Sequence, residues 1–366
     1  MRIAMVGVRG IPARMGGAER VVEELSRELA ARGHEVIVYC RRYYVAGSQA
    51  PEFARTIVTP HLGGKYLETI THTAASMVDL LRRNVDLVHI HSPGPGMMSW
   101  LAGLAGLPTV LTIHAPDWRR DKWPAPAKGA LRLGLWCGMH LANEVTAVGR
   151  ALAEELSARF GREVHHVPNG VRPAELRPPS AIARWGLADG RYVLTVGRVV
   201  PEKRLDLLLA AWGEAGGKGG TRLVVVGDLD SSSYGRGCRA AAAGDVLLLP
   251  PQYGAVLEEL YSNALFVVQP SSLEGMSMVL LEAAAHRRCI LATDIEANLD
   301  MMGDCILYFH SEDKTDLNRQ LSLLLNSEEM RNQLAQRAAS KVLSEYTWPA
   351  AADRMEQVYR RAILTA

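Results

Sequence analysis

Two glutamates eight positions apart, Glu274 and Glu282, have the types and the spacing that suggest binding chemistry most directly. The run Gly275-Met276-Ser277 between them is typical of a turn that opens a helix. Glu274 would then stand just before the helix, and Glu282 roughly two turns into it, about 10 Å away. Free backbone N–H groups at a helix start bind phosphate without any special side chain. We therefore predict an anion site between two carboxylates.

A basic loop earlier in the chain, Gly197–Lys203, follows a predicted strand. Arg198 offers a planar fork of donors and Lys203 a mobile point charge, which together suit a diphosphate. Taken alone, this loop could also be a solvated basic turn, although the diphosphate interpretation is favoured. Combined with Glu274 and Glu282, it suits a ligand with hydroxyls at both ends and a diphosphate in the middle. A sugar nucleotide has this layout.

The first loop of the chain carries a glycine pair, Gly16-Gly17, at the mouth of a predicted helix. The loop is too long for the dinucleotide fingerprint Gly-x-Gly-x-x-Gly. Paired glycines let the backbone approach a diphosphate closely. Arg9 and Arg14 in the same loop favour this interpretation over a simple tight turn.

Histidines and an acidic pair give weaker signals. His114 ends a predicted strand, where it could hydrogen-bond a substrate or transfer a proton, although a lone histidine is more often structural. The spacing of His89 and His91 could bind zinc, but no Cys or acidic residue stands near them in sequence. Asp228-Leu229-Asp230 is similar to a metal-binding Asp-x-Asp, yet no further acid supports it, and we expect a solvated loop. We predict no metal site.

Apolar strand-like runs alternate with helix-like segments, which predicts doubly wound parallel sheets. The first half contains five expected strands and two expected helices: Ile3–Val8, Val36–Cys40, Leu87–His91, Thr109–His114 and Glu144–Val148, with Ala18–Arg32 and Ala127–Ala142. The rhythm restarts in the second half with four more strands: Tyr192–Val196, Arg222–Val226, Val246–Leu249 and Leu265–Gln269. Ligands bind at the carboxyl ends of such strands, so we expect a cleft between two facing sheets.

The length of 366 residues exceeds what one hydrophobic core usually serves. We place an N-terminal Rossmann-like domain at 1–166 and a second one at 167–345. Prolines in 172–180 suggest the linker that follows the first domain. A last segment, 346–366, contains a helix over Ala350–Ile363, with Pro349 well placed near its start.

Composition excludes several classes of protein. Hydrophobic content of 48% and charged content of 22% are ordinary for a globular chain, and the net charge is only +2. Residues 1–166 hold 20 Lys and Arg against 15 Asp and Glu, an excess too small to indicate nucleic-acid binding. The five cysteines form no Cys-x-x-Cys pair, which favours reduced thiols and a cytoplasmic location. The N-terminus is typical of a buried strand rather than a signal peptide, and no apolar run approaches 18 residues.

One segment mixes cations with tryptophan, over Trp118–Trp123 and then at Lys128, Arg132 and Trp136. Tryptophan favours membrane interfaces, and cations favour anionic lipid. A peripheral contact with the cytoplasmic face of the plasma membrane is one interpretation. A surface loop and helix with some packed tryptophan is the other.

The ordered set of motifs resembles the retaining glycosyltransferases of the GT-B architecture, in particular family GT4. The motifs are Gly16-Gly17, His114, Pro168-Asn169-Gly170, Gly197–Lys203 and the Glu-x7-Glu of Glu274 and Glu282. Each is weak alone, but they stand in the family's order and cover essentially the whole chain. The opening Arg-Gly-Ile-Pro-Ala-Arg-x-Gly-Gly-x-Glu and the segment 117–123 are similar to bacterial rhamnosyltransferase-like enzymes that build surface polysaccharides.

The resemblance implies a fold of two Rossmann-like domains, the first binding the acceptor and the second the nucleotide-sugar donor, with the C-terminal helix crossing back to the first. It implies transfer of a hexose-type sugar to a hydroxyl of a glycan or lipid-linked acceptor, with retention and without a metal or other cofactor. Arg198 and Lys203 would hold the diphosphate, aided by backbone N–H groups at Gly16-Gly17 and Gly275–Ser277. Glu274 would bind sugar hydroxyls, Glu282 the ribose, and His114 the sugar near its reacting carbon.

Departures from the family leave alternatives open. The subgroup often has Asp-Gly where this chain has His114-Ala115-Pro116-Asp117, so His114 or Asp117 could occupy the catalytic position. His286 and Arg287 replace residues that are usually small, and the loop at 227–229 lacks a further glycine. The rival functions are a sugar-nucleotide epimerase or hydrolase on the same scaffold, and a degenerate nucleotide-sugar-binding protein. The sequence does not specify the donor, acceptor, linkage or oligomeric state.

Overall fold

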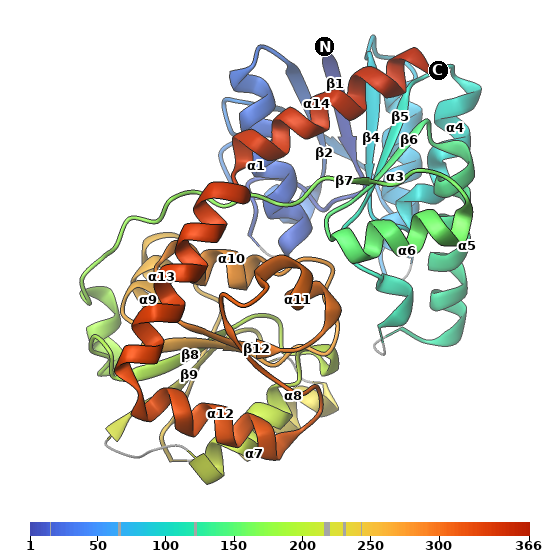
Figure 1. Cartoon of the computed structure of the whole chain (residues 1–366). Helices are drawn as coiled ribbons and strands as arrows, with labels where there is room; N and C mark the ends of the chain where they lie inside the picture. Colours follow the sequence, from blue (N-terminus) through green and yellow to red (C-terminus); the bar gives the residue numbers. More distant parts are fainter. Residues whose placement is uncertain (15, 65–66, 121–122, 216–219, 230–231, 243) are drawn as a thin grey trace. The chain divides into compact units, whose positions relative to one another are not determined.

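The computed structural model describes residues 1–14, 16–64, 67–120, 123–215, 220–229, 232–242 and 244–366. The chain divides into two compact units, one formed by Met1–Gly170 together with Trp348–Ala366, and the other by Val171–Thr347. Each unit is built around a parallel sheet with helices on both faces (Figure 1).

The first unit holds a seven-stranded sheet in the order β3-β2-β1-β4-β5-β6-β7. Its strands are β1 (Arg2–Val6), β2 (Glu35–Arg41), β3 (Arg55–Thr59), β4 (Leu87–His91), β5 (Thr109–Ile113), β6 (Glu144–Ala147) and β7 (His165–His166). The order reverses direction between β1 and β4, so the loops that follow these two strands diverge there. Such switch points are where open α/β sheets bind ligands.

Alternating residues of β1 show how the faces of this sheet are covered. Ile3 and Met5 pack with α1 and α14, whereas Ala4 and Val6 pack with α3, α5 and α6. Successive side chains of a strand point to opposite faces, so an almost wholly apolar strand must be buried on both. The helices of this unit are α1 (Gly17–Ala31), α2 (Arg42–Val45), α3 (Leu67–Leu80), α4 (Ser99–Leu104), α5 (Ala125–Leu141), α6 (Arg150–Phe160) and α14 (Trp348–Leu364), with short 3-10 turns η1 (Pro95–Met98) and η2 (Asp117–Arg119).

The second unit holds a six-stranded sheet in the order β10-β9-β8-β11-β12-β13. Its strands are β8 (Tyr192–Val196), β9 (Arg222–Val226), β10 (Val246–Leu249), β11 (Phe266–Gln269), β12 (Ile290–Thr293) and β13 (Leu307–Phe309). Its helices are α7 (Leu205–Ala215), α8 (Ser233–Ala241), α9 (Gly254–Ser262), α10 (Met278–Ala285), α11 (Glu296–Met302), α12 (Lys314–Asn326) and α13 (Glu328–Glu345), with 3-10 turns η3 (Ala181–Trp185) and η4 (Pro201–Lys203). The switch point lies between β8 and β11.

The last helix, α14, belongs to the first unit although its sequence follows the second. It lies beside α1 and contacts β5 and β6 (Figure 1). Its Glu356 accepts hydrogen bonds from Arg32 at 2.8 Å and pairs with the His34 ring at 2.6 Å. The predicted fold of two Rossmann-like domains with a returning C-terminal helix is confirmed in these elements.

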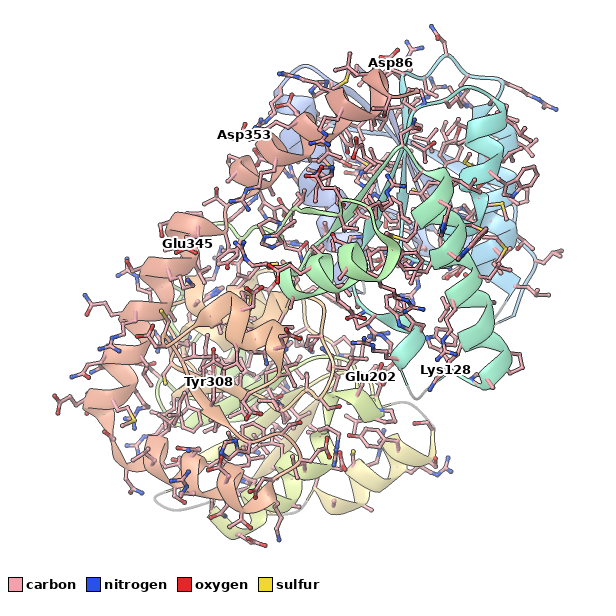
Figure 2. The ribbon with its side chains drawn as sticks, turned by 45° about the vertical axis from the view of Figure 1, so that its right-hand side comes forward. Asp86, Lys128, Glu202, Tyr308, Glu345 and Asp353 are labelled. Carbon is pink, nitrogen blue, oxygen red and sulfur yellow. The ribbon has the colours of Figure 1, made fainter. Side chains whose placement is uncertain are left out.

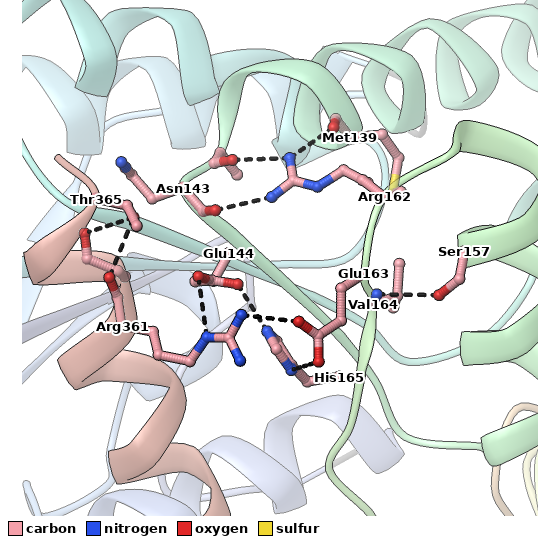
Figure 3. Close-up of polar contacts among 12 residues, drawn as sticks. Met139, Asn143, Glu144, Ser157, Arg162, Glu163, Val164, His165, Arg361 and Thr365 are labelled. Carbon is pink, nitrogen blue, oxygen red and sulfur yellow. Dashed lines mark hydrogen bonds and ion pairs between the residues drawn. The ribbon is translucent and has the colours of Figure 1, made fainter.

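A second ionic cluster ties the far end of α14 to the sheet (Figure 3). Arg361 lies 2.8 Å from Glu163 and 3.5 Å from Glu144 on β6. The ring of His165 on β7 lies between the same two glutamates, at 2.7 Å from Glu144 and 3.3 Å from Glu163. Glu144 is nearly buried, so this network gives a buried carboxylate the partners it needs.

Candidate functional site

Polar side chains gather at the switch point of the second sheet, where the loops after β8 and β11 begin. The Nζ atom of Lys203 is in direct contact with Oε1 of Glu274. The side-chain amide of Gln269 donates to the same oxygen at 3.0 Å and also to Oγ of Ser277. The loop after β8 is itself held in place, because the N–H of Ser272 donates to the carbonyl of Glu202 at 2.9 Å. Figure 2 labels Glu202 in this loop.

The cluster brings together two residues that the sequence assigned to different parts of a ligand. Lys203 was predicted for a phosphate and Glu274 for sugar hydroxyls, and here they neutralise each other. Their side chains are 20% and 10% exposed. In such a position the ammonium can move to bind an anionic group of a ligand, and the carboxylate can move to accept hydrogen bonds from its hydroxyls. Arg198, also predicted for the diphosphate, follows β8 with an exposed side chain.

The start of α10 differs from the prediction in its register. Ser277 is the N-cap, and its Oγ accepts the N–H of Leu280 at 3.3 Å. The helix therefore begins at Met278, and Glu282 lies about one turn in rather than two. The prediction counted the turn residues as helix, although serine is a favoured N-cap because its hydroxyl satisfies a free N–H. Gly275, Met276 and Ser277 are all buried.

Glu282 belongs to a buried aromatic cluster. It neighbours Tyr261 of α9, and burial together with this carboxylate raises the pKa of the Tyr261 hydroxyl well above its usual value. The ring of His286 stacks on Tyr261 with centroids 5.2 Å apart, and its Nδ1 donates to the Glu282 carbonyl at 2.8 Å. His286, which stands where the family usually has a small residue, thus packs against Tyr261 instead of facing solvent.

In the first unit, three histidines meet at the carboxyl ends of β4 and β5. His91 Nδ1 lies 3.1 Å from Nε2 of His114, and the two rings stack with centroids 5.3 Å apart. The ring of His89 lies against that of His91, with centroids 4.0 Å apart and the two planes tilted by 33°. Its ring nitrogens bond Tyr359 of α14 at 2.8 Å and Thr112 of β5 at 2.6 Å.

Burial sets the charge of these rings. It lowers the pKa of His89 to about 3 and that of His114 to about 4, and the pKa of His91 falls well below its usual value. All three are therefore neutral at pH 7. The spacing of His89 and His91 could have bound zinc, but their ring nitrogens contact side chains of the protein instead. Among the described residues, no group of three or more His, Cys, Asp or Glu is placed to hold a metal ion.

The other residue considered for the catalytic position, Asp117, lies in the turn η2. Its carboxylate is 2.6 Å from Nε of Arg120, a nearly buried side chain. Asp117 is thus committed to an ion pair, whereas the Nδ1 atom of His114 has no hydrogen-bond partner among the described residues.

The glycine-pair loop is closed onto α1 by acidic residues. Gly16 has a φ of 94°, a conformation that favours glycine, and a Cβ placed there would lie 2.2 Å from Oε2 of Glu19 and displace that side chain. Glu19 accepts the N–H of Arg9 at 3.4 Å, and Glu23 accepts that of Ala13 at 2.9 Å. The helix start that was predicted to meet a phosphate, Gly16-Gly17, therefore has a carboxylate of the chain beside it.

The tryptophan-rich segment is only partly exposed. Trp118 and Arg120 are 3% and 8% exposed, so they cannot face a lipid surface, and residues 121 and 122 of the segment lie outside the described residues. Trp136 of α5, at 51%, is exposed, as are Arg132 and Leu133 beside it. Within the described ranges, no helix has the length and apolar character needed to cross a membrane.

Several residues of these clusters were not predicted. Gln269 is a polar residue at the end of an otherwise apolar strand, Phe-Val-Val-Gln, and that exception was a usable signal. Tyr261 and Tyr359 carried no such signal, because each reaches its partner only through helix packing.

Comparison of the sequence with known proteins finds two family matches. Residues 15–175 match the family described as Glycosyltransferase Family 4, and residues 181–341 match Glycosyl transferases group 1. The chain is 27% identical to the D-inositol 3-phosphate glycosyltransferase of Kineococcus radiotolerans, over 99% of this chain and 95% of that protein.

Solved structures agree on the fold. Sucrose-phosphate synthase from Thermosynechococcus elongatus superposes with a TM-score of 0.79 at 22% identity, covering 100% of both chains. HepE from Anabaena, in complex with UDP-glucose, gives 0.79 at 15% identity over 98% of both. With both family matches in order along the chain and a GT-B arrangement of two parallel sheets, the chain belongs to the family 4 glycosyltransferases.

Proposed function

We propose that this glycosyltransferase moves a hexose-type sugar from a nucleotide diphosphate sugar to a hydroxyl of a glycan or lipid-linked acceptor, with retention of anomeric configuration and without a metal. Its place would be in cell-surface polysaccharide or glycolipid biosynthesis. The proposed class of donor is supported mainly by the pairing of Lys203 with Glu274 at the switch point of the second sheet. A cation and a carboxylate side by side match the phosphate and the hydroxyls of such a donor.

In this proposal the donor separates the ion pair. Its diphosphate takes the ammonium of Lys203 and the guanidinium of Arg198, which stabilise the leaving phosphate as charge develops. Glu274, released from Lys203 but still held by Gln269, accepts sugar hydroxyls. Glu282 accepts the ribose hydroxyls from a position braced by Tyr261. Backbone N–H groups at Gly275–Ser277 and Gly16-Gly17 add donors to the phosphates.

The catalytic step proposed is front-face attack, with His114 beside the donor sugar. The acceptor oxygen bonds the anomeric carbon on the side from which the phosphate leaves, the bond between that carbon and the phosphate oxygen breaks, and the departing phosphate takes the proton of the acceptor hydroxyl. The neutral state of this histidine suits hydrogen bonding to a hydroxyl more than charge compensation. The HepE structure, which contains UDP-glucose, supports a nucleotide-sugar donor by analogy.

A thermal-shift screen with UDP-, GDP-, ADP- and dTDP-sugars tests the donor class. A ligand at 100 times its Kd stabilises by about 2.7 kcal/mol, so the cognate nucleotide raises Tm clearly. Lys203→Ala abolishes the shift. Lys314→Ala removes an exposed lysine paired with Glu214 in the same unit and leaves the shift intact. Failure of every nucleotide to shift Tm supports a degenerate protein instead.

Turnover assays separate transfer from the rival reactions. Consumption of the donor in the absence of any acceptor favours an epimerase or hydrolase. The anomeric proton signal of the product reports retention directly. Undiminished rates after EDTA treatment are expected, and loss of activity that Mg²⁺ restores contradicts the metal-independent proposal.

A polyol phosphate is a second candidate acceptor, because the relative from Kineococcus radiotolerans is named for D-inositol 3-phosphate. Parallel assays with D-inositol 3-phosphate and with a lipid-linked sugar distinguish the two. Transfer to the first alone replaces the polysaccharide or glycolipid assignment.

We also propose a cytoplasmic enzyme that contacts an anionic membrane surface through the exposed sides of α4 and α5. Trp100 and Leu104 of α4 and Trp136 of α5 are 47%, 78% and 51% exposed, and α5 contains Lys128 and no acidic residue. Figure 2 labels Lys128 on this helix. Vesicles with anionic lipid are expected to co-sediment the protein at low salt. Trp136→Ser weakens sedimentation and Leu299→Ser, an exposed site in the second unit, does not. Absence of sedimentation refutes this surface.

A further inference from the structure

The ring of His91 is held between a sulfur atom and another imidazole. It is fully buried on β4. Its Nε2 lies 3.4 Å from Sδ of Met5 on β1, and its Nδ1 lies 3.1 Å from Nε2 of His114. The tilted ring of His89, on the same strand, lies against it with 4.0 Å between centroids. Each nitrogen of His91 therefore faces a different kind of partner.

Neutral rings have a definite tautomer. Because burial lowers the pKa of each ring, His91 and His114 each carry one N–H and one lone pair at neutral pH. A hydrogen bond between two neutral rings needs one ring to donate and the other to accept. The direction of the 3.1 Å contact is thus a choice between two arrangements, and the choice decides what His114 offers on its other side.

The thioether of Met5 decides the choice. A thioether sulfur has no hydrogen to give and acts only as a weak acceptor. The N–H of His91 therefore belongs on Nε2, facing Sδ, since the opposite tautomer would set a nitrogen lone pair against the sulfur lone pairs. Nδ1 of His91 is then the acceptor, Nε2 of His114 is the donor, and Nδ1 of His114 keeps its lone pair.

We propose that His91 is a positioning residue that, through Met5, fixes the tautomer of His114 so that Nδ1 of His114 accepts a hydrogen bond from a hydroxyl of the donor sugar. The assignment of the tautomer rests on these contacts and on the neutrality of the two buried rings. The contact between His114 and the donor sugar rests on the proposed function. In this arrangement His114 gives no proton from Nδ1, so it acts as a hydrogen-bond acceptor that selects donors carrying a hydroxyl at the facing position.

His89 supports the arrangement from behind. Its two nitrogens bond Tyr359 and Thr112, and the hydroxyl of Thr112 in turn lies 2.6 Å from that of Thr146. Both nitrogens of His89 are thus satisfied by oxygen atoms, and neither competes for His91. The adjacent ring of His89 limits how far His91 can move away from His114.

Long-range 15N–1H NMR of the full chain, labelled with [15N]histidine, tests the tautomers without any activity. His91→Asn and His114→Ala identify the two residues among the 11 histidines by loss of their signals. The expected pattern is protonation at Nε2 of both rings at pH 7. A His114 protonated at Nδ1 overturns the proposal. Met5→Leu, which keeps the volume but removes the sulfur acceptor, is expected to shift His91 and His114 together toward a mixture of tautomers.

Kinetics test the positioning role. His91→Leu removes the acceptor for His114 and is expected to lower kcat/KM by about tenfold, the scale of one neutral hydrogen bond. His91→Asn returns an amide oxygen near the position of Nδ1 and restores most of that loss. His72→Leu replaces another fully buried histidine, on α3, and serves as the matched control with unchanged kcat/KM. Equal losses in the Leu and Asn variants, with unchanged Tm, overturn the role.

A series of monodeoxy donors separately tests the hydrogen bond between His114 and a hydroxyl of the donor sugar. One member of the series should lose about tenfold in kcat/KM with the unaltered enzyme, and this penalty should vanish in His114→Ala. Nε2 protonation without any such penalty retains the tautomer assignment and overturns the contact between His114 and the sugar. Failure of every donor to bind or turn over counts instead against the proposed function.

Discussion

The two polar clusters stand at equivalent switch points of their sheets, yet they are built in opposite ways. In the second unit, Lys203 and Glu274 are charged, lie on loops beyond the strands and remain partly exposed. In the first unit, His89 and His91 are neutral, lie on a strand and are fully buried. The same sheet topology can therefore hold two kinds of polar cluster. Polar residues in the loops beyond the strands can be charged and can compensate a charged ligand, whereas polar residues within a strand are neutral and held in a fixed orientation.

This contrast has a physical cause. A charge inside a sheet covered by helices would lose its hydration, which is expensive unless a partner compensates it. Imidazoles avoid the cost by giving up their proton, and they keep one donor and one acceptor each. Charged groups stay beyond Val196 and Gln269, where β8 and β11 end and loops begin. The two clusters should consequently respond to different perturbations.

The largest expected effect comes from breaking the charged cluster. Lys203→Ala and Glu274→Ala should each lower kcat/KM at least about 100-fold, roughly the loss of one charge-assisted contact in the transition state. Because the two side chains touch, the double variant should lose less than the product of the single effects. Steady-state kinetics of the four proteins measure the coupling. Near-normal turnover in both single variants contradicts the proposed site, and Lys314→Ala provides the control.

The same contrast explains how much of the site the sequence could predict. The strands Tyr192–Val196 and Arg222–Val226 were predicted with the observed bounds, because continuous apolar runs that end in glycine leave few alternatives. Residues in the loops that follow these strands, such as Lys203 and Glu274, could be named as candidates from motif spacing. Their direct pairing could not be predicted, since it joins positions 71 apart.

Elements whose residues are polar or few in number were missed. β7 consists of His165 and His166 alone, and these side chains give no apolar signal. β3 and β13, at sheet edges, consist mainly of exposed or half-buried residues and were not predicted either. The partnership of His91 with His114 depends on β4 and β5 being neighbours in a particular register, which a single sequence does not specify.

A smaller effect should come from acid acting on the neutral cluster. The folded-state pKa of His89 is about 3, below the value of about 6.5 expected in the unfolded chain. The unfolded state therefore binds the extra proton, and the stability contributed by neutral burial is complete above pH 6.5 and lost as pH falls toward 3. The loss from this one ring is about 1.4 kcal/mol per pH unit below 6.

Urea unfolding between pH 4.5 and 7.5 measures this dependence. Carboxylates elsewhere titrate in the same range, so the informative quantity is the difference between the unaltered protein and His89→Gln. That difference in unfolding free energy should be constant above about pH 6.5 and should fall by about 1.4 kcal/mol for each unit of acidification below about pH 6. A pH-independent difference contradicts the neutral, buried state of His89.

The smallest effect should come from Tyr359→Phe. The Tyr359 hydroxyl lies 2.8 Å from Nδ1 of His89, and both groups are fully buried, so removing it leaves a ring nitrogen without its partner at a cost of about 1 kcal/mol. Tyr43→Phe, which removes an exposed hydroxyl bonded to Glu68, should change the unfolding free energy by less. Nucleotide-induced shifts in Tm should survive in Tyr359→Phe, because Lys203 and Glu274 belong to the other unit. Loss of nucleotide binding in this variant contradicts the separation of the two clusters, since it would mean that a hydrogen bond beneath the neutral histidines also maintains the charged site.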